Sequence, residues 1–264
     1  MSLDSNDAPE LLAIAQAAAR AAGRIALGHA HGEIVDKGDR DFVSEADLAS
    51  EHAVRQLLRA KTPNIPILGE EAGGPDPAIG LVWVVDPIDG TVNYLRGLPT
   101  FAIALSLLSD GETVLAATYL PEADAIYTAV RGQGSYVNGQ RLTASSTAGL
   151  RKAVITIDQF TFVDDDPEAM NDLRLGIIQA LVPVVHRLRI YGASAIDLAW
   201  VAQGKLDGCI ILANKPWDTS GGVLLAREAG AIATDLEGAP HSLEAATTIV
   251  ASSRIAEHLQ SSIT

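Results

Sequence analysis

Cysteine is almost missing from this sequence, since Cys209 is the only one in 264 residues. A disulfide framework within the chain is therefore excluded, and the single thiol fits a reducing cytoplasm as the expected location. Long apolar stretches are missing too, because no run approaches the ~18 residues that a membrane-spanning helix requires. The opening residues, MSLDSNDAPE, are polar and acidic, unlike a secretory signal. The sequence thus predicts a soluble cytoplasmic protein without a membrane partner.

Positively charged residues are also few. The chain has 19 lysines and arginines against 33 aspartates and glutamates, which gives a formal net charge of −14. Such a chain repels the phosphate backbone of nucleic acids, so nucleic acid is not an expected partner. The acidic excess has two interpretations: a solvated acidic surface, or carboxylates gathered in a site that binds cations.

Metal-binding patterns of histidine and cysteine are absent as well. The histidines show no metal-ligand spacing with one another or with Cys209, which argues against a zinc site. They stand at positions 29, 31, 52, 186, 241 and 258.

The first half of the chain predicts a largely antiparallel sheet with helices on one side. An alanine-rich helix is expected over 9–29, and the capping box Ser44-x-x-Asp47 begins a second helix that stops before Pro63. Strands are expected at 64–68, at 81–85 with its end at Asp86, and in the β-rich segments 101–120 and 125–143, with hairpin turns at 110–111 and 138–139.

Strands and helices alternate in the second half, which predicts a layered, mixed α/β lobe. The segment 143–149, TASSTAG, is the expected boundary, so lobes 1–145 and 146–264 should pack tightly as one catalytic unit. Helices are expected near 167–181, 194–204 and 219–230 and at the C-terminus, and strands at 153–157, 187–191, 206–212, 231–236 and 247–252.

The stretch VVDPIDGT, residues 84–91, places two aspartates at the end of an apolar run. Pro87 favours an extended conformation of Asp86 and stiffens the turn, so both aspartates could face one side of a rigid bend with the Ile88 carbonyl. Gly90 and Thr91 then offer backbone N–H groups at an expected helix start, which can bind an anion. Ligands for a cation and a cradle for an anion together indicate a phosphoester site.

Acidic residues also end or begin other predicted elements, where open α/β folds place ligands. They are Glu70, Glu71, Asp86, Asp89 and Asp218. Each has a structural alternative, such as a turn aspartate at position 89 or a helix N-cap at position 218. If they converge, two unit charges ~4 Å apart repel by about 4 kcal/mol at an effective dielectric of 20. Convergence would therefore require cations, and all-oxygen ligands favour Mg²⁺.

Four blocks in order resemble the inositol monophosphatase family, whose members are Mg²⁺-dependent, lithium-sensitive phosphatases of sugar and polyol phosphates. The blocks are DFVSEAD (41–47), GEE (69–71), DPIDGT (86–91) and WDTSGGVLLAREAGA (217–231). The resemblance extends over nearly the whole chain. It implies a layered αβαβα sandwich of the sugar-phosphatase type.

Carried over residue by residue, the resemblance implies a site for two to three Mg²⁺ ions. Glu70, Asp86 and the Ile88 carbonyl would hold one ion, and Asp86, Asp89 and Asp218 a second, with a third, weaker ion on Glu70 and water. Gly90 and Thr91 would receive the phosphate. Thr91 and Asp47 would orient a metal-activated water for in-line attack, while the capping box gives Asp47 a structural alternative.

The substrate side departs from the family pattern. Gly192, Ala193 and Ser194 match the family's hydroxyl-binding helix start, with Arg189 and Lys215 as further possible contacts. Ile211 stands where inositol-specific members carry a glutamate. Inositol 1-phosphate is the first substrate expected, while histidinol phosphate, fructose 1,6-bisphosphate and a 3′-phosphonucleotide stay open. The remaining alternative is a catalytically silent protein that binds cations or phosphate, and a homodimer is the family's common assembly.

Overall fold

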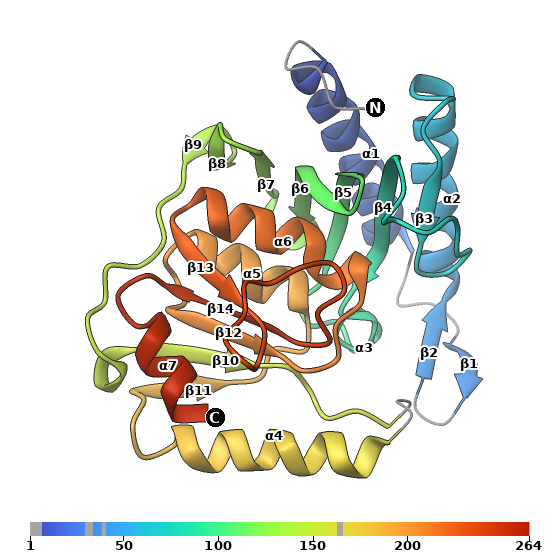
Figure 1. Ribbon diagram of the computed structural model, residues 1–264. Helices are drawn as coiled ribbons and strands as arrows, with labels where there is room; N and C mark the ends of the chain where they lie inside the picture. The colour runs from blue at the N-terminus through green and yellow to red at the C-terminus, as the bar shows by residue number, and fades with distance from the viewer. Residues whose placement is uncertain (1–6, 30–33, 39–40, 163–165, 264) are drawn as a thin grey trace.

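The computed structural model describes residues 7–29, 34–38, 41–162 and 166–263, and for 34–38 and 41–43 it describes the backbone alone. Its elements stack in five layers, helix, sheet, helix, sheet, helix (Figure 1). This arrangement confirms the αβαβα sandwich. None of the helices in the described ranges combines the length and apolar character that crossing a membrane requires.

The first sheet has seven strands in the order β3-β4-β5-β6-β7-β8-β9, and it is antiparallel except for the parallel pair β3 and β4. Two helices, α1 (Ala8–Gly28) and α2 (Glu45–Lys61), cover one face. Its strands are β3 (Ile67–Gly69), β4 (Leu81–Asp89), β5 (Ala102–Ser109), β6 (Glu112–Leu120), β7 (Ala125–Val130), β8 (Gly134–Val137) and β9 (Gln140–Arg141).

The second sheet has five strands of mixed direction in the order β11-β10-β12-β14-β13. Between the two sheets lie α5 (Ser194–Ala202) and α6 (Pro216–Glu228), and α4 (Pro167–Leu181) and α7 (Ala256–Ile263) cover the outer face. The strands are β10 (Val154–Ile157), β11 (Arg187–Arg189), β12 (Gly208–Ile211), β13 (Ala231–Thr234) and β14 (Thr248–Ser252).

The remaining elements of the described chain are short. The hairpin β1 (Ile34–Gly38) and β2 (Asp41–Ser44) precedes α2, and α3 (Thr91–Leu95) follows β4. Two turns of 3₁₀ helix lie at Pro121–Ala123 and Leu150–Lys152.

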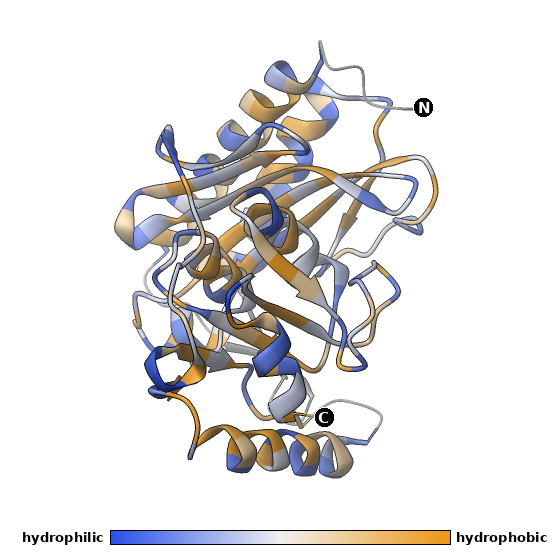
Figure 2. Cartoon of the chain, turned by 60° about the vertical axis from the view of Figure 1, so that its left-hand side comes forward, coloured by the Kyte–Doolittle hydropathy of each residue, from blue (hydrophilic) through white to orange (hydrophobic). Residues whose placement is uncertain are grey.

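Small residues allow the layers to approach closely. The buried face of α1 consists of alanines and Gly23, where an added Cβ would lie 2.6 Å from the Tyr119 ring of β6. In the middle layer, a Cβ on Gly222 of α6 would lie 2.5 Å from Leu198 of α5. Figure 2 shows mostly apolar colours along the strands that these helices cover. Close packing thus sets how near α1 lies to β6 and how near α6 lies to α5.

Local signals in the sequence place several elements correctly. Ser44 and Asp47 form the predicted capping box at the start of α2, with each side chain bonded to the other residue's backbone N–H. At the β5–β6 turn, Asp110 and Gly111 both have positive φ, 48° and 79°. At the β8–β9 turn, Asn138 and Gly139 also have positive φ, 47° and 79°. Both turns therefore have the geometry that Asp-Gly and Asn-Gly hairpins favour.

Candidate active site

A bulge in β4 brings Asp86 and Asp89 to the same face of the sheet. In a regular strand, residues three apart point to opposite faces. Here Asp86 lies opposite Ala104 of β5 and Asp89 opposite Ala102, so three steps along β4 match two steps along β5. The extra residue is tolerated at Pro87 because a proline donates no ladder hydrogen bond. The prediction that this strand ends at Asp86 is therefore wrong, since β4 continues through the motif to Asp89.

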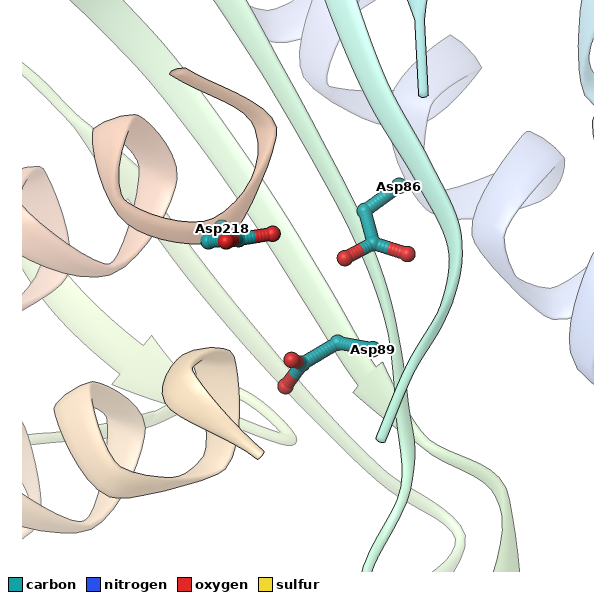
Figure 3. A group of neighbouring side chains, drawn as sticks. All are labelled: Asp86, Asp89 and Asp218. Atoms are coloured by element: carbon teal, nitrogen blue, oxygen red, sulfur yellow. The ribbon is translucent and has the colours of Figure 1, made fainter. Parts of the chain in front are cut away.

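Asp218 faces these two aspartates from the first turn of α6 (Figure 3). The N-cap residue of α6 is Lys215, so the alternative of Asp218 as a plain N-cap is wrong. One carboxylate oxygen from each of Asp86, Asp89 and Asp218 lies within 4.8 Å of the others. Three carboxylates from two distant parts of the chain thus converge. Such convergence is the condition under which the electrostatic argument calls for a cation.

The surroundings of these carboxylates oppose their ionisation. Burial raises the pKa of Asp86 well above its usual range, and the negative charges of Glu70, Asp89 and Asp218 raise it further. Burial also raises the pKa of Asp218, with added repulsion from Asp89 and Glu70. Without a cation, the site therefore stores electrostatic repulsion that a divalent ion would relieve.

The donor set fits magnesium. Buried carboxylate oxygens are the ligands that Mg²⁺ prefers, and Mg–O bonds of about 2.1 Å span up to about 4.2 Å between opposite ligands. Oxygens within 4.8 Å of one another need to close only slightly to reach one ion. Glu70 and Ile88, whose backbone carbonyl is an expected ligand, line the same cavity.

Asp89 also joins β4 to the middle helix layer. Its Oδ1 accepts a hydrogen bond of 3.1 Å from the backbone N–H of Ser194, and its Oδ2 one of 2.9 Å from Ala195. The N-cap residue of α5, Ala193, has no side chain that could do this. Burial raises the pKa of Asp89 to about 7, although these backbone hydrogen bonds lower it. Asp89 therefore caps α5 from a distant strand.

Asp47 and Thr91 lie beside this cluster and contact each other. The Thr91 hydroxyl donates to Asp47 Oδ1 at 3.2 Å and lies 3.1 Å from the Ile88 carbonyl oxygen. The other carboxylate oxygen of Asp47 accepts the backbone N–H of Ser44 at 2.9 Å. Burial raises the pKa of Asp47, and its hydrogen bonds oppose that rise. One side chain thus closes the capping box of α2 and fixes the Thr91 hydroxyl.

The start of α3 depends on Gly90. Its φ of 88° lies in the left-handed region, and an added Cβ would lie 3.0 Å from the Thr100 carbonyl oxygen and 3.1 Å from the Ala193 Cβ. A side chain at this position would strain the backbone and close the gap to α5. The glycine therefore leaves the backbone N–H groups before and within α3 accessible from the cavity.

A model of the inositol monophosphatase family matches residues 7–264 of this sequence. The chain belongs to the inositol monophosphatase family. It is accordingly a phosphomonoesterase, and members of this family are generally metal-dependent.

Relatives of this phosphatase are similar over most of their length. The probable inositol 1-monophosphatase ImpA of Mycobacterium tuberculosis is 41% identical, covering 91% of this chain and 88% of that protein. A fructose-1,6-bisphosphatase/inositol-1-monophosphatase of Aquifex aeolicus is 34% identical, over 87% of this chain and 86% of that one. Among solved structures, the extragenic suppressor protein suhB of Bartonella henselae has a TM-score of 0.90 at 30% identity, covering 97% of this chain and 98% of that one.

The cavity beside these carboxylates has a volume of ≈ 540 Å³ and brings most of the sequence-predicted residues together. Arg189 is not among its lining residues in the described chain, and its side chain donates to the Leu188 carbonyl instead. Glu71 follows Glu70 in the same loop but does not line the cavity either. The predicted residues that do line it are Glu70, Asp86, Ile88, Asp89, Gly90, Thr91, Gly192, Ala193, Ser194, Ile211, Lys215 and Asp218.

Sequence reasoning missed one part of the cavity wall. It follows β10 and contains Asp158, Phe160 and Phe162, and Arg174 of α4 lines the cavity with them. Arg174 is fully buried, forms two hydrogen bonds of 2.8 and 3.0 Å with the Asp158 carboxylate, and lies 5.8 Å from the Phe160 ring centre. An arginine and an aspartate 16 residues apart carry no local signal, so a three-dimensional structure was needed to find them.

Proposed function

We propose that this chain is a Mg²⁺-dependent phosphomonoesterase of small polyol phosphates, with inositol 1-phosphate as the first substrate to test. The observation that carries the proposal is the convergence of Asp86, Asp89 and Asp218 within 4.8 Å, which makes their carboxylates repel one another unless a cation compensates them. The substrate class is supported by the M. tuberculosis relative, which is named an inositol 1-monophosphatase.

The ligands come from three places in the fold: the loop after β3, strand β4 and the first turn of α6. Glu70, Asp86 and the Ile88 carbonyl would hold one ion, and Asp86, Asp89 and Asp218 a second, with Glu70 available to a third. Bound there, magnesium would act as a Lewis acid toward the phosphoryl oxygens and lower the pKa of the attacking water. The bulge of β4 fixes two of these ligands and the first turn of α6 supplies another, so the ion positions depend on the packing of both layers.

The remaining residues would position phosphate and water. Gly90 and Thr91 would bind phosphate through their backbone N–H groups, aided by the positive end of α3. Because the Thr91 hydroxyl donates to Asp47, its oxygen lone pairs would accept a hydrogen bond from the attacking water. Asp47, which accepts the Thr91 hydroxyl, would then favour the transfer of the water's proton along this pair. Gly192, Ala193 and Ser194 would contact the hydroxyl groups of the leaving alcohol.

Fructose 1,6-bisphosphate is the second candidate. Ile211 is buried and lines the cavity, so it offers no acceptor for a ring hydroxyl and weakens selection for inositol. The A. aeolicus relative is named for both activities, which supports this candidate.

The test is phosphate release from four substrates: inositol 1-phosphate, fructose 1,6-bisphosphate, histidinol phosphate and a 3′-phosphonucleotide. Magnesium, EDTA, and magnesium with added lithium form the three arms, and Asp218→Asn is the control. We expect Mg²⁺-dependent, lithium-inhibited hydrolysis that Asp218→Asn lowers by at least roughly 10³-fold. Hydrolysis of none of the four by a protein that binds Mg²⁺ would favour a silent binding protein, and equal kcat/KM on all four would indicate broad specificity.

A further inference from the structure

The loop that carries Glu70 is held by a buried side chain of α2. Glu51 has an exposed fraction of 2%. Its Oε2 accepts the backbone N–H of Glu71 at 2.9 Å, and its Oε1 accepts the N–H of Ala72 at 3.2 Å. Both donors immediately follow Glu70. The carboxylate of Glu51 therefore fixes the main chain on the C-terminal side of a proposed metal ligand.

Arg55, one turn further along α2, completes this contact. Its Nε donates to Glu51 Oε1 at 2.6 Å, and its guanidinium donates to the carbonyl of Gly73 at 2.6 Å and to that of Ile67 at 3.3 Å. Ile67 begins β3, and Gly73 forms an antiparallel bridge with Gly69 across the loop. The pair thus holds both sides of the loop, and we call Glu51 and Arg55 the α2 clamp.

Gly69 makes room for the clamp. An added Cβ would lie 2.3 Å from Glu51 Oε1 and 2.8 Å from an Arg55 nitrogen. Beyond it, the backbone N–H of Glu70 donates to the carbonyl of Val85 at 3.1 Å, directly before Asp86 on β4. The backbone of Glu70 is therefore held between β4 on one side and α2 on the other.

Stability alone does not account for a charged pair in this place. Removing two charges from water costs several kcal/mol per ion, and well-packed apolar residues are often as stabilising as a buried pair. Such a pair selects one conformation of the loop, because its directional hydrogen bonds fit only that arrangement of donors and acceptors. On the same face of α2, Asp47 precedes Glu51 by four residues. One helix thus positions the Asp47–Thr91 contact and the Glu70 loop together.

We propose that Glu51 and Arg55 are positioning residues that set how tightly the active site binds its divalent cation, by fixing the loop of Glu70. The inference rests on the proposed function, in which Glu70 is a metal ligand. Neither residue lines the cavity, so neither touches the ion or the substrate. Loss of the clamp should leave the other ligands in place and weaken only the contribution of Glu70.

Calorimetric titration with MgCl₂ alone, on Glu51→Gln and Arg55→Gln, tests the inference. One lost charge-assisted hydrogen bond to the loop corresponds to roughly tenfold weaker Mg²⁺ binding. The Mg²⁺ concentration for half-maximal phosphate release should rise by the same factor, while kcat at saturating Mg²⁺ changes less than about twofold. Arg59→Gln, an exposed arginine one turn further along α2, is the matched control and should match the wild type.

The outcomes separate the clamp from the proposed function. Unchanged Mg²⁺ affinity in both variants would overturn the clamp, as would a loss of kcat that saturating Mg²⁺ does not restore. If either variant fails to fold, Gly69→Ala displaces the clamp without removing it and should weaken Mg²⁺ binding in the same way. A wild-type chain that binds Mg²⁺ but hydrolyses none of the four substrates would overturn the proposed function, and calorimetry would still decide on the clamp.

Discussion

The Oδ2 atom of Asp89 accepts a hydrogen bond of 2.9 Å from the backbone N–H of Ala195, 106 residues further along the chain. A proposed metal ligand on β4 therefore also caps a helix in the middle layer. Substitution of Asp89 should therefore change both the charge of the site and the start of α5. Substitution of Asp86 or Asp218 should change the charge and leave the start of α5 as it is.

Asp89→Ala should loosen the start of α5. It removes both acceptors, so the N–H groups of Ser194 and Ala195 lose about 1 kcal/mol of capping each. We expect amide hydrogen exchange at these positions to accelerate by roughly fivefold to tenfold. Asp218→Asn is the control, because it changes the cluster without touching α5, and exchange in α5 should stay at the wild-type rate. Equal exchange in the two variants would contradict the cap.

Asp218→Asn should stabilise the protein when magnesium is absent. Burial and the charges of Asp89 and Glu70 raise the pKa of Asp218, so its ionised form is unfavourable in the folded state. In EDTA at pH 8, the melting temperature should therefore rise by a few degrees. Saturating Mg²⁺ at about 100 times its Kd should raise the wild-type Tm by about 5 to 10 °C and the variant's by much less. A variant that keeps the full magnesium shift would show that Asp218 is not a ligand.

Asp197→Asn should raise stability in a pH-dependent way. Asp197 is buried in α5, and its Oδ1 has no hydrogen-bond partner among the described residues. Burial, followed by the charge of Asp89, raises its pKa well above the usual range. Because the folded-state pKa is the higher one, wild-type stability falls as pH rises above the unfolded value of about 3.9. The gain in free energy of unfolding should thus be largest near pH 8 and vanish near pH 4. Urea denaturation of both proteins across this pH range measures the trend, and a gain that does not change with pH would contradict it.

Arg174→Met should be among the most destabilising single changes in the cavity wall. The guanidinium is fully buried and bonds the Asp158 carboxylate through two nitrogens, and that carboxylate also accepts the Leu212 N–H at 2.8 Å. Its removal leaves a buried charge unpaired, at a cost of about 3 to 5 kcal/mol. Arg131→Ala breaks the exposed pair with Glu112 and should cost less than about 1 kcal/mol. Similar urea midpoints for both variants would contradict this difference.

Sequence patterns succeeded where the cause of a structure is local. Ser44 and Asp47 lie three residues apart, and the Asp110–Gly111 turn needs only its own two positive φ angles. Pro167 marks the first residue of α4, which ends at Leu181 as expected. In each case the residues that determine the element are also those that form it.

The details that depend on distant partners were not accessible in this way. The bulge of β4 exists through its register with β5, so the sequence DPIDGT alone could not show that both aspartates share a face. Glu51 and Arg55 are spaced like any helical ion pair, and only the packing of α2 against the loop gives them a further role. The family resemblance implied that the carboxylates converge, and electrostatics added that cations must then compensate them, while the geometry came from the fold.

The position of α6 between the two sheets has a consequence for protein synthesis. Its first turn carries Asp218, whereas Asp86 and Asp89 lie more than a hundred residues earlier in the chain. A ribosome therefore releases the β4 aspartates long before the helix that completes their cluster. Until α6 has emerged and docked, the nascent polypeptide lacks the full set of carboxylates, so the proposed metal site cannot form before that step.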